Sequence, residues 1–210
     1  MKVKRTIIGA LLFLLFIVWS IIVCTVDVRP VGLNESMVGL ASINQSIHNY
    51  TGVIMTLYSV TDILSIIPIT ITIVFAVVGF VQLIRRRSLI KIDKDLLCLG
   101  CFYMVVFLSF IAFEVFPVNY RPILIEGTLE ASYPSSTTLL IISIMPTTDI
   151  MLRRRIKSRV LMSVLGLSIY LFTVLMVIGR FISGVHWFSD IIGGILLSTS
   201  LVLLFSGISE

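Results

Sequence analysis

Six long apolar stretches constrain the fold of this 210-residue chain more than any other feature. A helix needs about 20 mostly apolar residues to cross a bilayer, and stretches near that length occupy residues 6–26, 61–84, 96–118, 135–152, 160–179 and 190–208. These runs are too continuous to be the alternating strands of a membrane barrel. We therefore predict an all-α protein, a six-transmembrane-helix bundle, with residues 1–210 forming a single membrane-embedded domain.

The composition excludes most soluble classes of protein. Only 13% of the residues are charged and the mean hydropathy is +1.11, whereas soluble domains carry about 25% charged residues. A soluble enzyme and a nucleic-acid partner are both disfavoured, and membrane lipids are the expected surroundings. The first stretch could be a cleaved signal peptide, but its apolar run is long and no small-x-small site follows it. We predict that it is retained as a helix.

The basic residues are distributed unevenly around these stretches. Thirteen of the sixteen precede the first stretch, or lie between the second and third or the fourth and fifth: Lys2, Lys4, Arg5, Arg85, Arg86, Arg87, Lys91, Lys94, Arg153, Arg154, Arg155, Lys157 and Arg159. Cytoplasmic loops of membrane proteins are enriched in Lys and Arg. The pattern predicts a plasma (cell) membrane protein with both termini in the cytoplasm. Only Arg29, Arg121 and Arg180 fall on the outer side, where residues 27–60 form the longest predicted loop.

Two other outer segments collect the residues that suit a phosphate ligand. Arg121 and Arg180 could give bidentate contacts to phosphate oxygens. Ser135 and Ser136 open the fourth stretch, whose N-terminal amides would face outward and form an anion site. Each feature alone also has an ordinary explanation, as a helix cap, a headgroup contact or a cation at a helix end.

His186 and Asp190 lie in the third outer segment and are four residues apart. On a helix they would share a face, and the carboxylate could accept a hydrogen bond from the imidazole. That contact would fix the tautomer and leave the other ring nitrogen free to attack phosphorus or accept a proton. An interfacial histidine beside a helix cap is the alternative reading of this pair.

Together these residues resemble the type 2 phosphatidic acid phosphatase/vanadium haloperoxidase superfamily. Arg180, five residues, His186, three residues and Asp190 reproduce its third signature. Residues 134–137 (Pro-Ser-Ser-Thr) are similar to its second signature, Pro-Ser-Gly-His. Arg121 and Pro122 are similar to the end of its first, a Lys followed by six residues and Arg-Pro. The six predicted spans resemble the membrane phosphatases of that superfamily.

The resemblance implies a lipid phosphatase that acts at the outer leaflet and needs no metal or other cofactor. By analogy His186 would be the nucleophile of a phosphohistidine intermediate, and Asp190 would orient it. Arg121 and Arg180 would hold the phosphate, and Ser135 with the Ser136 amide would complete the phosphate-binding site.

Two positions depart from the family pattern. Glu114 stands where the first signature has Lys, and Thr137 stands where the second has the His that protonates the leaving group. The chain is then either a phosphatase for substrates with good leaving groups, such as isoprenoid diphosphates, or a catalytically impaired lipid-phosphate-binding or sensing protein. His48 is a candidate replacement acid, and Arg29 has no predicted role. Ion-coupled transport is disfavoured because no charged path crosses the bundle.

Overall fold

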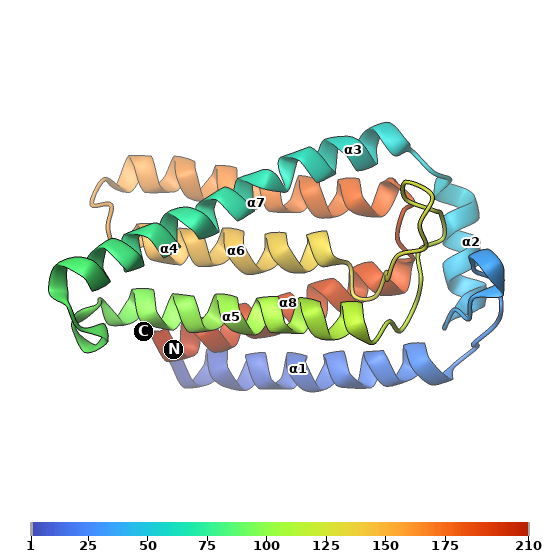
Figure 1. Cartoon of the computed structure of the whole chain (residues 1–210), viewed down its shortest axis with the longest axis horizontal. Coiled ribbons are helices and arrows are strands. Elements are labelled where there is room, and N and C mark those ends of the chain that lie inside the picture. The colour runs from blue at the N-terminus through green and yellow to red at the C-terminus, as the bar shows by residue number, and fades with distance from the viewer. Residues whose placement is uncertain (1, 210) are drawn as a thin grey trace.

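The structure is a computed structural model that describes residues 2–209, and its long helices lie side by side along the longest axis (Figure 1). The described residues form the helices α1 (Lys2–Thr25), α2 (Ala41–Thr51), α3 (Met55–Leu64), α4 (Ile66–Arg86), α5 (Lys94–Val115), α6 (Ser136–Arg153), α7 (Arg159–Ile182) and α8 (Phe188–Ser209), with short 3₁₀ turns at Leu33–Glu35 and Leu89–Lys91. Across residues 2–209 extended pairing is limited to isolated bridges in the loops. The predicted all-α fold is confirmed.

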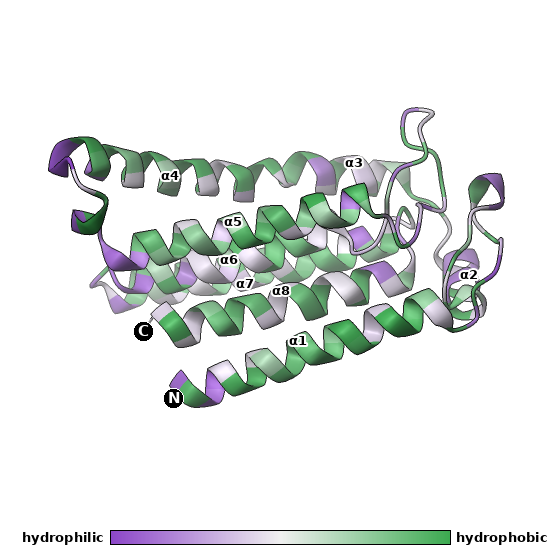
Figure 2. Cartoon of the chain, turned by 60° about the horizontal axis from the view of Figure 1, so that its bottom comes forward, coloured by the Kyte–Doolittle hydropathy of each residue, from purple (hydrophilic) through white to green (hydrophobic). Residues whose placement is uncertain are grey.

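Five helical rods within residues 2–209 are long and apolar enough to cross a membrane: α1, the α3–α4 rod (Met55–Arg86), α5, α7 and α8. Their outward faces are largely apolar, and hydrophilic residues gather toward the ends of the bundle (Figure 2). The chain is thus an integral membrane protein.

Helix α6 runs with these five rods but has a more polar sequence, including Pro146 and Asp149. It packs against α4, α5, α7 and α8, and most of its side chains are buried. Neighbouring helices therefore shield its polar groups from lipid. The count of six spans stays a prediction. In it, α6 would be the sixth span and would lie in the interior of the bundle.

The outer segment between α1 and α4 differs from the predicted loop. Residues 41–51 form helix α2, which packs on the outer end of α8. Asn44 makes this contact specific, because its amide exchanges hydrogen bonds with the Ser189 backbone at 3.0 Å and side chain at 2.9 Å. The second rod also begins at Met55 rather than near residue 61, with its helices joined at Ser65.

The connections divide between the two ends of the bundle (Figure 1). The α1 start, the α8 end and the α4–α5 and α6–α7 connections share one end, and these segments hold the thirteen basic residues. The opposite end holds α2, the α5–α6 connection and the α7–α8 turn. Arg29 lies there and pairs with Asp27 at 2.7 Å. The assignment of the first end to the cytoplasm stays a prediction.

Two adjacent glycines bring α8 close to the start of α6. A Cβ on Gly193 would lie 2.6 Å from the ring of Tyr133, and one on Gly194 would lie 3.0 Å from Thr138. The close approach lets the Ser135 amide donate to the Asp190 carbonyl at 3.0 Å. The α5–α6 connection is thereby held against the first turn of α8.

Candidate functional site

Arg180 occupies the last turn of α7 and its side chain is almost wholly buried. Its Nη1 donates to Thr61 Oγ1 at 3.2 Å, and its Nη2 lies 3.5 Å from Asp62 Oδ1. The guanidinium carbon also lies 4.5 Å from the centre of the Tyr58 ring, a cation–π distance. Residues of α3 therefore fix the direction of Arg180.

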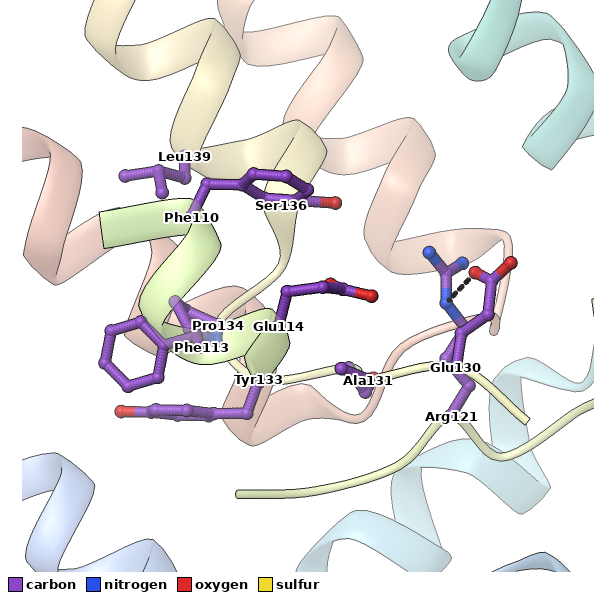
Figure 3. A pocket seen from close by; sticks show the side chains of 11 residues that line it. Phe110, Phe113, Glu114, Arg121, Glu130, Ala131, Tyr133, Pro134, Ser136 and Leu139 are labelled. Atoms are coloured by element: carbon purple, nitrogen blue, oxygen red, sulfur yellow. Dashed lines mark ion pairs between the residues drawn. The ribbon is translucent and has the colours of Figure 1, made fainter. Parts of the chain in front are cut away.

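Arg121 lies in the α5–α6 connection and faces the same tyrosine. Its Nε is 3.1 Å from Glu130 Oε2, and its guanidinium carbon is 5.9 Å from the Tyr58 ring centre (Figure 3 shows the ion pair). The connection doubles back on itself here, because the Arg121 amide donates to the Glu130 carbonyl at 3.0 Å. Among residues 2–209, Arg121 Nη1 and Arg180 Nε are buried without hydrogen-bond partners. These buried donors can bind an anionic ligand.

His186 lies in the α7–α8 turn and is 4% exposed. Its Nδ1 is 3.0 Å from Ser132 Oγ, and its Nε2 is buried with no hydrogen-bond partner in the described part of the chain. The predicted direct hydrogen bond to Asp190 is absent, because Nδ1 and Oδ2 are 4.0 Å apart. The reason is local: α8 begins at Phe188, so His186 precedes the helix and the i, i+4 helical geometry does not apply.

Asp190 is fully buried in the first turn of α8. Its carboxylate accepts hydrogen bonds from the Trp187 amide at 2.9 Å, Asn119 Nδ2 at 3.2 Å and Ser189 Oγ at 3.3 Å, and from Ser132 Oγ. A buried carboxylate requires such donors to offset its desolvation. Asp190 thus ties the α5–α6 connection and the α7–α8 turn together.

The surroundings of His186 keep its imidazole neutral. Burial lowers the pKa of His186 well below 6.5, and the positive charges of Arg121 and Arg180 lower it further. A neutral imidazole at pH 7 has a free lone pair, which nucleophilic attack requires.

The start of α6 supplies a third element of the site. Ser135 is the N-cap, and its hydroxyl accepts a hydrogen bond from Thr138 Oγ1 at 3.0 Å, so its side chain serves the helix itself. Ser136 and Thr137 follow and line the adjoining cavity. Amides at the first positions of a helix have no partner within it and attract anions.

A groove of about 590 Å³ starts at these groups and runs between α3–α4, α5 and α6. Its charged and polar residues are Tyr58, Asp62, Ser65, Thr72, Tyr103, Arg121, Glu130, Ser136, Thr137 and Arg180, and its apolar walls include Ile69, Ile73, Val106, Phe107, Leu140 and Ile144. A cavity of about 190 Å³ adjoins it and shares Arg121, Glu130 and Ser136. Glu114 also lines this cavity and points toward the Arg121–Glu130 pair (Figure 3).

The sequence of this region matches a known family. The model of the PAP2 superfamily matches residues 112–209, a range that holds the site residues named so far except those of the α3–α4 rod and the groove-lining residues of α5. Residues 112–209 are thus similar in sequence to the PAP2 superfamily.

The fold of the whole chain is similar to that of a solved membrane protein. It superposes with a TM-score of 0.66 on the crystal structure of the first transmembrane PAP2-type phosphatidylglycerolphosphate phosphatase from Bacillus subtilis. The sequence identity is 17%, and the match covers 95% of this chain and 94% of the other. No curated protein matches the chain by sequence. The chain thus has the fold of a PAP2 membrane phosphatase.

The PAP2 fold gathers most of the predicted residues. Arg121, Arg180, Ser136 and Thr137 line one groove. His186 and Asp190 line neither cavity, but both are hydrogen-bonded to Ser132, which lines the smaller one. The candidate acid His48 lines neither cavity; its ring lies 5.3 Å from that of Trp187, and burial lowers its pKa.

Several important residues were not predicted, namely Tyr58, Asp62, Asn119, Glu130 and Ser132. They come from α3 and the irregular α5–α6 connection, at positions that none of the three signatures specifies. For Asn119, Glu130 and Ser132, the only sign of a role in the site was that they lie close in sequence to Arg121 or Pro134.

Proposed function

We propose that this protein is a phosphatase that hydrolyses a lipid phosphate or isoprenoid diphosphate at the outer leaflet. The observation that carries the proposal is the groove, in which two buried arginines lie at the polar end of apolar walls. An amphiphile with a phosphate head and a long apolar chain fits that division of polarity.

The proposed reaction has two displacements at phosphorus. In the first, the lone pair of His186 Nε2 attacks phosphorus, and the bond to the lipid oxygen breaks with its electron pair leaving on that oxygen. In the second, water attacks the phosphohistidine, the phosphorus–nitrogen bond breaks, and inorganic phosphate and the imidazole are released. Arg121, Arg180 and the α6 amides would stabilise charge on the phosphoryl oxygens. No metal or other cofactor is needed for either step.

The leaving group decides which substrates react well. Thr137 occupies the position from which a general acid would protonate the departing oxygen, and a hydroxyl is too weak an acid for this task. A diphosphate releases a phosphate ester with a second pKa of about 6, which departs without protonation. We therefore expect faster turnover of an isoprenoid diphosphate than of phosphatidate.

A protein that binds or senses lipid phosphate without hydrolysing it is the alternative. The replaced positions favour it, because Thr137 supplies no acid and Glu114 adds a carboxylate to the cavity that Arg121 also lines. Under this reading the groove and both arginines keep their role in binding.

The test is phosphate release by the purified protein in proteoliposomes, with phosphatidate and an isoprenoid diphosphate compared. We expect release to be faster from the diphosphate and to be lost in His186→Ala. Arg29→Ala is the matched control, because Arg29 is an outer arginine that pairs with Asp27 away from the groove. Activity that survives His186→Ala would overturn the mechanism, and equal or reversed rates would remove the leaving-group argument. Saturable binding without release, lost in Arg121→Gln, would establish the alternative.

A further inference from the structure

Ser132 lies between His186 and Asp190, although it belongs to none of the three signatures. Its hydroxyl is 3.0 Å from His186 Nδ1 and is also hydrogen-bonded to Asp190 Oδ2. The nitrogen and the carboxylate oxygen are themselves 4.0 Å apart, beyond hydrogen-bonding distance. All three residues are buried, and Ser132 is 2% exposed.

The direction of these hydrogen bonds follows from the chemistry of the groups. A carboxylate that already accepts from Trp187, Asn119 and Ser189 can only accept from Ser132 as well. A hydroxyl has one proton, so after donating to Asp190 it can only accept from the imidazole. Nδ1 must then carry the hydrogen of His186, which leaves the lone pair on Nε2.

The position of Ser132 is fixed by its neighbours. Its amide donates to the Asn119 carbonyl at 2.8 Å. The next residue, Tyr133, is buried against Phe16 and Phe113 and bonds to Ser20 Oγ at 2.7 Å. The backbone at Ser132 therefore cannot shift without disturbing a packed aromatic cluster.

We propose that Ser132 is a positioning residue that holds His186 in the Nδ1–H tautomer and links it to Asp190. When Nε2 bonds to phosphorus the ring becomes positively charged, and the oriented hydroxyl dipole and the carboxylate behind it stabilise that charge. The kinetic consequence rests on the proposed phosphatase function, whereas the tautomer does not.

The tautomer can be measured directly by NMR. The chain has two histidines, so protein with ¹⁵N-labelled histidine gives two imidazole patterns, and a His48→Gln variant assigns them. In wild type at neutral pH we expect His186 to be protonated at Nδ1 and unprotonated at Nε2. In Ser132→Ala we expect protonation to move toward Nε2, and Ser132→Thr, which keeps the hydroxyl, should retain the wild-type pattern. A wild-type His186 protonated at Nε2, or a Ser132→Ala tautomer unchanged from wild type, would overturn the proposal.

Kinetics give a second readout. We expect Ser132→Ala to lower kcat by between about 10-fold and the ~10⁴-fold that a wrong histidine tautomer costs in serine proteases, with a much smaller change in KM because the arginines still bind phosphate. Ser132→Thr should restore kcat, and exposed Ser46→Ala is the matched control. A KM effect with unchanged kcat would contradict the proposal. Wild-type protein that releases no phosphate would refute the proposed function, while comparison of the tautomers of wild type and Ser132→Ala would still decide the role of Ser132.

Discussion

Gly184 allows the turn that carries His186 to pass directly over the α2–α3 connection. Its φ is +69°, and a Cβ there would lie 1.8 Å from the Gly52 carbonyl oxygen and 3.3 Å from Val53 Cα. Gly127 provides a matched control, because its φ is +80° but a Cβ would meet nothing within 4 Å. Replacing each glycine with alanine separates the cost of a left-handed backbone from the cost of the contact.

The expected magnitudes follow from these two terms. A left-handed conformation costs an alanine about 1–2 kcal/mol, and this applies to both variants. Gly184→Ala must also move two backbone segments apart by more than about 1 Å to restore ordinary contact, which adds roughly 1–3 kcal/mol. The shift would strain the hydrogen bond from the Ile54 amide to the Ser183 carbonyl, now 3.0 Å. A displacement of this size near the proposed nucleophile can cost about 10²-fold in rate.

The assay is thermal unfolding in one detergent, followed by the fluorescence of Trp19 and Trp187, with phosphate release measured on the same samples. One kcal/mol corresponds to about 2–4 °C in Tm for a chain of this size. We therefore expect Gly184→Ala to unfold several degrees below Gly127→Ala and to lose most of its activity. Equal Tm values for the two variants, with activity kept in both, would refute the steric reasoning.

Four further predictions concern the charges and the replaced general acid. Arg121→Gln removes a positive charge that lowers the pKa of His186, so the His186 NMR titration should move to higher pH than in wild type; a lower or unchanged midpoint would contradict that electrostatic assignment. Because burial keeps the wild-type imidazole neutral to well below pH 6.5, wild-type hydrolysis should continue below that pH. A rate that falls on acidification with a midpoint at or above pH 6.5 would contradict this prediction. Thr137→His should raise the turnover of phosphatidate more than that of a diphosphate, by up to the ~10²–10⁴-fold typical of general acids; no preferential gain would mean that protonation is not limiting. Glu130→Gln frees Arg121 from its ion pair, so inhibition by orthovanadate should strengthen several-fold, and weaker inhibition would show that Glu130 assists anion binding.

The sequence was sufficient for the features that the bilayer imposes. Predicted spans at 96–118, 160–179 and 190–208 agree with α5, α7 and α8 to within a few residues, because a backbone in lipid must satisfy its hydrogen bonds within a helix of fixed length. The third signature was equally readable, since its residues lie within one turn and two helix ends.

Contacts between distant segments could not be predicted in this way. Helix α2 is held by Asn44 against Ser189, residues separated by 145 positions, and its own composition is that of a loop. Ser132 was missed for a related reason: the i, i+4 spacing indicated a direct contact between His186 and Asp190, whereas the turn before α8 moves the ring away and leaves room for a hydroxyl. Spacing alone carries no information on where an irregular connection places a third side chain.

The two arginines of the proposed phosphate site are held in place by the protein itself. Each has a carboxylate partner, Arg121 with Glu130 at 3.1 Å and Arg180 with Asp62 at 3.5 Å, so neither buried charge depends on ligand. A ligand must compete with carboxylates that carry one charge each. Ordinary phospholipids are phosphodiesters with a single negative charge at phosphorus, so exchange would gain them little, whereas a phosphomonoester or diphosphate carries nearly two charges or more. Under the proposed function the same ion pairs that hold the arginines in place would therefore select rare terminal phosphates over the abundant diesters of the bilayer.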